Sequence, residues 1–523
     1  MPTHAEAIAR TLAERGVQYV FGLPGGEIIA FINACREAGL RFLLTGHEAS
    51  AAWMAQVIGQ ITGVPGVCAA TLGPGATNLV TGVANAWLDR APMLAVTAQI
   101  PSATIDTMSH QRLPLSNLFS NISKGSFSVG AEDTIHLTNR SMDLAGAPRP
   151  GPVHMTLASD LAVQEYTHSP LQANSQQSPT SRTTVAQIAA RIEAAHRPLV
   201  LIGLGAAPTD SSAVRALVEK LQAPFLVTPK VKGIVTEDHP LFAGVASGMA
   251  IDRDILATIQ AADLIVAVGF DPVECDKTWF TGVNVAALDT APMTEGNYHP
   301  AELIGDLGDL LSELTTLIRT PRPWPEDLLA VRRAAIQRKP ISGMSPLRII
   351  EELRAIFPRD GIATCDVGSH KLVMGQFWRA YEPGTFFMSN GLSGMGFGIP
   401  AAIAAQLAHP TKHVVAVVGD GGMLMMIHDL ALVRALNLPI LMVVLSDRSL
   451  SLIRVSAERR GFPAYGVDFN PPDFAAIGQA FGIASKRVGA IEEAKNVICD
   501  ALTERVPFLL DIPIDHREYY ELV

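Results

Sequence analysis

Two aspartates late in the chain, Asp420 and Asp447, have the residue type and spacing of ligands for a hard metal ion. They lie 27 residues apart, and each follows a short apolar run, HVVAVVG before the first and ILMVVLS before the second. Carboxylate oxygens suit Mg²⁺, and the glycines around Asp420 would let backbone amides approach a phosphate closely. These groups together indicate a site for Mg²⁺ and a diphosphate. Alternatively, Asp420 is only the turn residue of an Asp-Gly pair, and Asp447 an ordinary strand-end or helix-cap residue.

A βαβ unit would bring these two aspartates together. An apolar strand, a glycine turn, one helix over 423–436 and a second strand follow one another between residues 413 and 447. Such units place consecutive strands side by side and parallel, so both aspartates would lie at the carboxyl edge of one sheet. Ligands bind at that edge in open α/β folds. The spacing therefore favours the metal interpretation over two unrelated turns.

A further candidate is Glu48, which follows the strand-like run RFLLT and precedes an apolar helix that begins near Ala49. A carboxyl group in an apolar pocket can give or take a proton near neutral pH. A simpler interpretation is a favourable negative charge at a helix N-terminus. The local sequence alone favours the simpler interpretation.

Three glycine-containing junctions between a strand and a helix are also candidates. They are TLGPGATN (71–78), DVGSHK (366–371) and SNGLSGMGFGIPAA (389–402). DVGSHK offers a backbone amide, a hydroxyl and an imidazole, which are suitable groups for diphosphate oxygens, although the motif alone does not decide this. Tight packing alone would explain either of the other two junctions. IGLGAAP (202–208) hints at a dinucleotide fingerprint, but it lacks the third glycine and the acidic partner.

Composition and charge limit the class of protein. The chain has 523 residues, of which 48% are hydrophobic and 17% are charged, so large buried cores are available. A formal net charge of −10 argues against a nucleic-acid binder. The five cysteines are scattered without metal-ligand spacing, as is typical of reduced thiols in a cytosolic protein. Because we find neither a signal peptide nor an apolar run of about 18 residues, we expect a cytoplasmic protein with no membrane contact.

Strand-like and helical patterns alternate along the chain, which predicts an α/β fold with parallel sheets. A stretch rich in Ser, Thr and Gln at 167–184 predicts a linker, and TPRPWPED, beginning at residue 320, marks a second boundary. We therefore predict three open parallel-sheet domains, at 1–166, 185–320 and 340–523. The third repeats the strand–helix alternation of the first.

Taken together, these motifs resemble the thiamine-diphosphate enzyme superfamily over nearly the whole chain and in the right order. Members have a pyrimidine-binding domain, a central domain and a diphosphate-binding domain that carries Gly-Asp-Gly and a later Asn. Here Gly419-Asp420-Gly421 is followed by Asp447 at the Asn position. The most similar group is acetolactate synthase, especially its FAD-independent catabolic type. This similarity rests on SHQ (109–111), ISK (122–124), GFDPVE (269–274), DVGSH (366–370), SNG (389–391) and IPID (512–515).

The resemblance implies a role for each matching residue. Glu48 matches the glutamate that hydrogen-bonds N1′ of the aminopyrimidine and promotes loss of the C2 proton of the thiazolium, and Gln111 is a candidate for the substrate side. Asp420, Asp447 and the backbone carbonyl of Ser449 match the Mg²⁺ ligands. Further cofactor contacts are implied at Gly73, Pro74, Asn78, Gly368, Ser369, His370, Ser393, Gly419, Gly421, Gly422 and Met423, and at Met395, where relatives place the apolar residue that bends the cofactor.

The implied activity depends on thiamine diphosphate and Mg²⁺. It is decarboxylation of a pyruvate-like 2-oxo acid followed by carboligation to a second carbonyl acceptor. FAD is not expected, because the central block carries no convincing flavin signature. The resemblance also implies a homodimer or homotetramer whose sites are shared between the first domain of one chain and the third domain of another. The alternatives are a non-oxidative 2-oxo acid decarboxylase or lyase on the same cofactor, a flavin-dependent oxidase, and a catalytically silent paralogue.

The chain departs from the family pattern at three places. Gly46 stands where relatives read Arg before His-Glu, the segment 56–60 (QVIGQ) replaces Asp-Gly-Tyr-Ala-Arg, and Asp447 replaces the metal-site Asn. A second carboxylate should still bind Mg²⁺. The departures suggest an unusual donor or acceptor and motivate the silent-paralogue alternative, whereas retention of Glu48 argues against that alternative.

One more segment, 453–469, follows the metal motif where relatives carry a mobile cover over the site. Arg454, Arg459 and Arg460 lie in it. They would serve to capture a substrate carboxylate, or they form an ordinary solvated surface.

Overall fold

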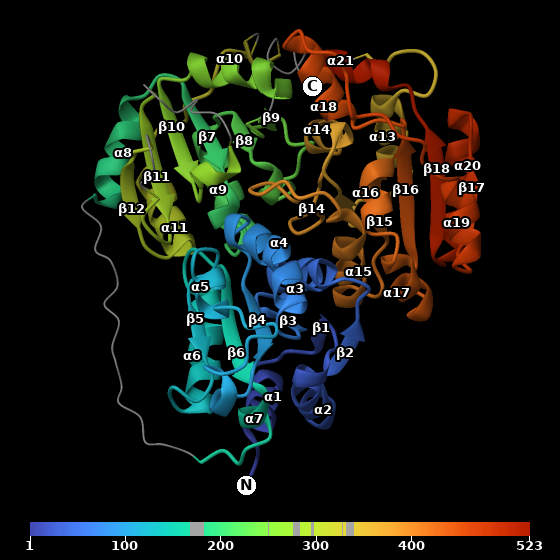
Figure 1. Ribbon diagram of the computed structural model, residues 1–523. Coiled ribbons are helices and arrows are strands. Elements are labelled where there is room, and N and C mark those ends of the chain that lie inside the picture. The colour runs from blue at the N-terminus through green and yellow to red at the C-terminus, as the bar shows by residue number, and fades with distance from the viewer. Residues whose placement is uncertain are drawn as a thin grey trace. The chain divides into compact units, whose positions relative to one another are not determined.

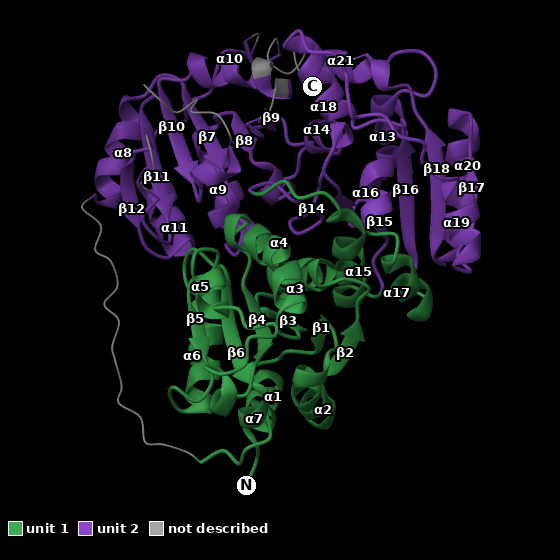
Figure 2. Ribbon diagram, viewed as in Figure 1, with its two compact units in different colours: residues 1–177, 392–410, 426–438 green, residues 178–391, 411–425, 439–523 purple. Residues whose placement is uncertain are grey.

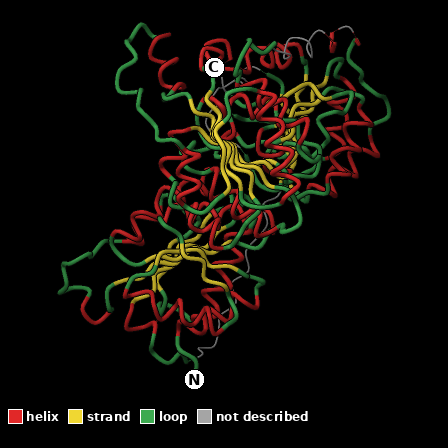
Figure 3. Tube along the Cα trace, turned by 90° about the vertical axis from the view of Figure 1, so that its right-hand side faces the viewer, coloured by secondary structure: helices red, strands yellow, loops and turns green. Residues whose placement is uncertain are grey.

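The strands of the described residues form three six-stranded sheets in which all neighbouring strands are parallel. Helices flank the strands on both sides (Figure 1, Figure 3), so the predicted α/β class with three parallel sheets is confirmed. None of the helices described is both long and apolar enough to cross a membrane. The predicted linker falls almost wholly outside the described residues. The computed structural model describes residues 1–167, 183–248, 250–275, 283–293, 298–326, 328–330 and 339–522.

The first sheet has the strand order β2-β1-β3-β4-β6-β5. Its core is formed mainly by strands β3, β4 and β6 and by helices packed on their faces. The strands are β1 Tyr19–Leu23, β2 Arg41–Leu44, β3 Gly66–Ala70, β4 Met93–Gln99, β5 Ser126–Ser128 and β6 Pro152–Ala158. The helices are α1 His4–Glu14, α2 Ile29–Glu37, α3 Glu48–Thr62, α4 Pro74–Leu88, α5 Leu115–Ser120, α6 Thr134–Gly146 and α7 Ser159–Ala162.

The central sheet has the order β12-β11-β10-β7-β8-β9. Counted from its own first strand and read from β9, this is 3-2-1-4-5-6, the order of dinucleotide-binding sheets. Apolar clusters cover both of its faces. The strands are β7 Pro198–Ile202, β8 Phe225–Val227, β9 Phe242–Val245, β10 Leu264–Val268, β11 Val285–Asp289 and β12 Ala301–Ile304, and the helices are α8 Val185–Ala194, α9 Ser211–Leu221, α10 Arg253–Ala261 and α11 Leu307–Leu317.

The third sheet has the order β14-β13-β15-β16-β18-β17. Numbered from its own first strand, this order is identical to that of the first sheet, so the predicted repeat of the first block is confirmed. The strands are β13 Ile362–Cys365, β14 Phe386–Met388, β15 Val414–Gly419, β16 Ile440–Ser446, β17 Ala484–Arg487 and β18 Phe508–Pro513. The helices are α13 Pro346–Ile356, α14 Ser369–Phe377, α15 Gly398–Ala408, α16 Asp420–Met425, α17 Asp429–Ala435, α18 Ser451–Arg459, α19 Phe474–Ala480, α20 Ile491–Glu504 and α21 Tyr519–Leu522.

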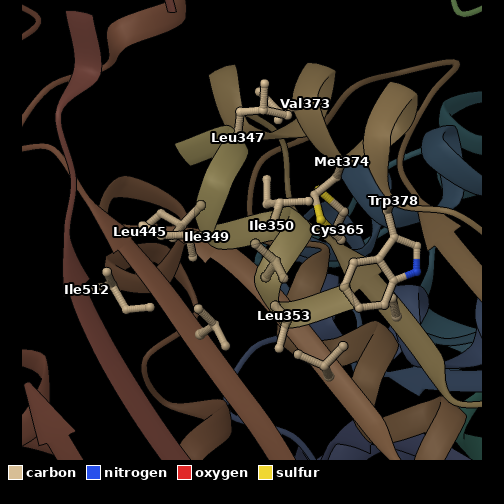
Figure 4. Packing of buried hydrophobic residues seen from close by; sticks show 14 of the residues in the cluster. Leu347, Ile349, Ile350, Leu353, Cys365, Val373, Met374, Trp378, Leu445 and Ile512 are labelled. Carbon is tan, nitrogen blue, oxygen red and sulfur yellow. The ribbon is translucent and has the colours of Figure 1, made fainter. Parts of the chain in front are cut away.

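One face of the third sheet packs against helices α13 and α14. Ile350 and Leu353 of α13, Met374 of α14 and Trp378 are buried with Cys365 of β13 in one apolar cluster (Figure 4). This packing holds the start of α14, which carries the predicted diphosphate contacts, against the carboxyl ends of the strands.

Residues of the predicted third domain are divided between two compact units (Figure 2). The first unit consists of residues 1–177, 392–410 and 426–438, and the second of residues 178–391, 411–425 and 439–523. In the first unit, α15 packs against α3. Helix α15 is buried along nearly its whole length, as an apolar helix with no polar stripe requires. The domain limits at 166, 185, 320 and 340 stay predictions.

The single helix predicted over 423–436 is wrong. Two short helices occupy this stretch, α16 and α17, and a turn over 426–428 separates them. The amide of Asp429 donates to the carbonyl of Met426 within this turn. Side chains of the turn pack on the start of α3, as described below, which accounts for the break in the helix.

Candidate active site

The carboxyl ends of β15 and β16 bring the two predicted metal ligands together. The last paired residues of these strands are Gly419 and Leu445, so Asp420 and Asp447 follow at the same edge of the sheet. The amide of Arg448 donates to Asp420 Oδ2 at 2.7 Å. Asp447 accepts hydrogen bonds from the amide of Ser449 (3.2 Å) and from the hydroxyl of Ser451 (2.6 Å). The juxtaposition expected from the βαβ unit is therefore present.

The electrostatics of this edge favour a cation. Burial, and then the negative charge of Asp447, raise the pKa of Asp420 to about 6. Burial also raises the pKa of Asp447. Two carboxylates near one another repel each other, and a divalent ion between them would offset this repulsion and the cost of burying their charges. Among the described residues there is no cluster of three or more His, Cys, Asp or Glu side chains suited to a metal. A metal ion here would therefore complete its coordination shell with backbone carbonyl oxygens and oxygens of a bound ligand.

Buried polar atoms at the start of α14 have no partner in the part of the chain that is described. They are Ser369 Oγ and His370 Nε2, and both side chains are almost fully buried. Burial lowers the pKa of His370 to about 4, and an anionic ligand beside the ring would oppose this shift by favouring a proton on Nε2. A buried polar atom without a partner is costly unless a ligand satisfies it. These atoms therefore fit a group with oxygens, such as a diphosphate.

Glycines around the same edge leave room that a side chain would fill. A Cβ at Gly419 would lie 3.1 Å from His370 Cε1, and one at Gly368, where φ is +156°, would lie 2.8 Å from the same atom. At Gly422 a Cβ would lie 1.9 Å from Asp366 Oδ2. Asp366 lies within the motif DVGSHK, but the motif indicated no role for this residue. Its position directly after the strand that ends at Cys365 was the sequence feature that could have identified it as a site residue.

Glu48 begins α3 and is almost fully buried, at 4% exposure. Its Oε2 accepts a hydrogen bond from Asn78 Nδ2 at 2.9 Å, and its Oε1 would lie 3.3 Å from a Cβ at Gly75. Both of these residues belong to the first turns of α4. The junction at 71–78, for which tight packing was an open alternative, thus provides the direct partner of Glu48.

Helix α4 begins at Pro74 after Gly73, whose φ of +58° suits glycine. Gln111 also has a left-handed backbone, with φ +56°, and its side chain lies against Gly73: a Cβ there would be 3.0 Å from Gln111 Cβ. Gln111, predicted to lie on the substrate side, and Gly73, predicted to contact the cofactor, are therefore neighbours. Ser393 is exposed and Met395 partly buried in the loop before α15.

Two of the three arginines of 453–469 are engaged with neighbouring groups, and Arg460 is exposed. Arg454 pairs with Asp468, and its Nε donates to Ser449 Oγ at 3.1 Å. Arg459 donates to the carbonyl of Tyr520 at 2.5 Å. These contacts fix the start of the segment onto the metal edge, and they favour a structural role for Arg454 over substrate capture.

Comparison with known proteins identifies the class. The model of the thiamine pyrophosphate enzyme N-terminal TPP binding domain matches residues 2–119, that of the central domain residues 185–314, and that of the C-terminal TPP binding domain residues 366–512. The chain belongs to the thiamine pyrophosphate enzymes of the acetolactate synthase type.

Similar relatives carry names of that group. A probable acetolactate synthase large subunit of Methanocaldococcus jannaschii is 31% identical over 99% of this chain and 93% of its own. An acetolactate synthase of Bacillus subtilis is 29% identical over 99% of this chain and 94% of its own. A catabolic acetolactate synthase of Raoultella terrigena is 30% identical over 98% and 95%. The resemblance inferred from the motifs is therefore confirmed.

Proposed function

We propose that this protein decarboxylates a 2-oxo acid and joins the remaining fragment to a second carbonyl compound, as an acetolactate synthase-like enzyme. The observation that carries the proposal is the edge of the third sheet, where a buried and a partly buried aspartate, Asp420 and Asp447, lie near two buried polar atoms that have no partner among the described residues. Such a set suits Mg²⁺ with a diphosphate. A silent paralogue is disfavoured, because Glu48 is retained, buried and hydrogen-bonded.

Thiamine diphosphate and Mg²⁺ fit the residues that are present. Asp420, Asp447 and the carbonyl of Ser449 would hold the ion, while Ser369 Oγ and His370 Nε2 would meet diphosphate oxygens. When bound, this cofactor supplies the carbon nucleophile that makes and breaks bonds next to a carbonyl. The remaining proposed contacts are Gly73, Pro74, Asn78, Gly368, Ser393, Met395, Gly419, Gly421, Gly422 and Met423.

Glu48 would hold and release a proton at N1′ of the aminopyrimidine. Its Oε2 already accepts from Asn78, which orients the carboxyl group and leaves Oε1 beside Gly75, where no side chain intervenes. A general acid–base group contributes typically about 10²- to 10⁴-fold to a rate. Gln111, held in a left-handed conformation against Gly73, would contact the substrate.

A flavin is not part of the proposal. In the central sheet, the loop after β7 corresponds to the phosphate-binding loop of dinucleotide folds. Here its amides are engaged by the protein: Gly205 N donates to Gly269 O at 2.7 Å, and Leu204 N to Glu274 Oε2 at 2.8 Å. Burial raises the pKa of Glu274 to about 8, so a neutral acid rather than a phosphate occupies this position.

We further propose a homodimer or homotetramer in which sites are completed between chains, a cytoplasmic location, and small-molecule substrates only. The cofactor alone does not separate carboligase from lyase activity, because the two differ in whether a second carbonyl or a proton takes up the fragment. Retention of the synthase pattern throughout the chain favours carboligation.

The test is a product assay on the purified protein. Protein, thiamine diphosphate and Mg²⁺ are incubated with pyruvate and a panel of 2-oxo acids and aldehydes, and the products are identified by mass spectrometry. We expect CO₂ release with formation of a 2-hydroxy ketone product. Aldehyde as the sole product would assign a lyase, and absence of CO₂ release from every donor would refute the enzyme proposal.

A further inference from the structure

Gly46, one of the departures from the family pattern, lies against His428 within the first compact unit. A Cβ at Gly46 would lie 2.4 Å from His428 Cδ2 and 2.8 Å from His428 Cβ. Real Cβ atoms do not approach other atoms so closely, and the overlap includes Cβ of His428 as well as its ring, so a rotation of the ring alone would not remove it. The histidine ring therefore occupies the space of a side chain at position 46, and the two positions constrain each other.

His428 and its neighbour Asp429 meet the first turn of α3 through Ser50. The Ser50 hydroxyl donates to Asp429 Oδ2 at 2.8 Å, and His428 Nε2 lies 3.2 Å from Ser50 Oγ. With the Nε2–H tautomer of His428, and with the serine proton given to Asp429 rather than to the Met426 sulfur, the serine oxygen accepts the Nε2–H. Ser50 and Asp429 are completely buried. The result is a directed hydrogen-bond chain from imidazole to hydroxyl to carboxyl.

The charges around this chain favour its uncharged form. Burial raises the pKa of Asp429 to about 7. Burial, and then the nearby His47, lower the pKa of His428. Ser50, which contacts both groups, is uncharged, and so is the Met426 sulfur beside Ser50. A neutral hydrogen-bond chain of this kind acts through hydrogen bonds and shape. It therefore does not require the positive charge of the arginine that relatives carry at position 46.

The same turn of α3 carries Glu48. His47 caps the helix, its Nδ1 accepting from the amide of Ala49 at 3.0 Å. Glu48 is the first helical residue and faces Asn78 of α4, while Ser50 faces Asp429. The first turn of α3 is thus held on one side by α4 and on the other by the residues that precede and begin α17.

We propose that Gly46, Ser50, His428 and Asp429 form a clamp that positions Glu48 for proton transfer. The four residues act through the backbone of α3, so they are positioning residues and make no contact with substrate in this proposal. The inference rests on the proposed function of Glu48. It also accounts for Gly46: the glycine accommodates the histidine that holds the helix.

The contact between Gly46 and His428 is tested first on the protein without cofactor. We compare thermal unfolding midpoints of wild type, G46A, H428A and the double variant. G46A should lower the midpoint by several degrees, and H428A should suppress most of that loss because it removes the overlapping ring. The control is G146A, since a Cβ at Gly146 meets nothing within 4 Å. Additive effects of G46A and H428A would overturn the proposed contact.

The positioning role is tested by kinetics. H428A should lower kcat about tenfold or more, while KM and the Kd for thiamine diphosphate, followed by tryptophan fluorescence, change less than about threefold. H428Q should recover most of kcat, because a glutamine Nε2 can donate to Ser50 Oγ. H136A, a partly exposed histidine of the same unit, is the matched control.

The outcomes separate the two proposals. A wild-type protein that releases no CO₂ from any 2-oxo acid would refute the proposed function. An active wild type whose kcat is unchanged in H428A, or an H428Q variant as impaired as H428A, would refute the clamp. Loss of stability in G46A with full kcat would show a contact that is structural only, and would refute the clamp as well.

Discussion

Replacing Asp429 by asparagine should make the protein more stable at neutral and alkaline pH. Burial raises the pKa of this carboxyl from 3.8 to about 7 in the folded state. Because the folded pKa exceeds the unfolded one, the stability contributed by the group is fully present below pH 4 and is lost as pH rises through 7. Asparagine keeps the oxygen that accepts the Ser50 hydroxyl, but it has no charge to bury.

The magnitude follows from the size of the shift. About three pH units correspond to about 4 kcal/mol in the free energy of unfolding, at roughly 1.4 kcal/mol per unit. Wild type and D429N should therefore be equally stable near pH 4, and the difference should grow between pH 4 and 7. Above pH 7 the difference in the free energy of unfolding should become constant, with D429N the more stable of the two proteins. For a folded unit of roughly 200 residues, such as the first compact unit that contains Asp429, such a difference raises the unfolding midpoint by about 10 °C.

The assay is a series of thermal unfolding midpoints between pH 4 and 9 for the two proteins without cofactor. Taking the difference between them at each pH cancels the titration of groups distant from the substituted position, and His428, whose Nε2 lies 3.5 Å from Asp429 Oδ1, is the neighbour that this difference still includes. D106N, at an exposed aspartate, serves as the control and should follow wild type throughout. A pH-independent difference, or a D429N variant less stable than wild type at pH 8, would refute the reasoning.

Three other substitutions test the site itself. Glu48→Gln should lower kcat at least a hundredfold with thiamine diphosphate still bound by calorimetry, because the amide keeps an oxygen for Asn78 but cannot exchange the proton; full activity would contradict its role. Asp447→Asn should retain Mg²⁺-dependent cofactor binding with a Kd within about tenfold of wild type, since an amide oxygen is also a hard ligand, and loss of binding in calorimetry would argue against this metal position. Gly422→Ala should destabilise the protein by about 1–3 kcal/mol in denaturant titrations, because its Cβ would lie 1.9 Å from Asp366 Oδ2, whereas Gly375→Ala, with nothing within 4 Å, should not; equal effects would contradict the geometry.

Much of the fold could be predicted from the sequence because its signals are local. Mostly apolar strands of three to seven residues alternate with helices, and a parallel sheet follows from that alternation. The meeting of Asp420 and Asp447 was predictable for the same reason, since one βαβ unit places both at one edge. The burial of Glu48 was not predictable locally, because its partners Asn78 and Gly75 come from a different helix.

The sequence did not reveal where α15 and α17 pack. An apolar helix such as α15 must be buried, but periodicity does not identify the surface that covers it, and here that surface is α3. The predicted helix over 423–436 was wrong for a related reason. Its residues have good helical propensity, yet contacts of Met426 and His428 with Ser50, more than 370 residues earlier, accompany a turn in its middle. Tertiary packing overrides local propensity at such positions.

Two of the three departures from the family pattern are accommodated by their surroundings. Gly46 has a partner of matching shape in His428. Each oxygen of Asp447 accepts one hydrogen bond, from Ser449 N–H and from Ser451 O–H, which leaves lone pairs for a metal ion. A position that no longer serves a function is under no constraint to fit its neighbours. The fit of the glycine to the histidine ring, and of the carboxylate to its two donors, is therefore an argument against a silent paralogue.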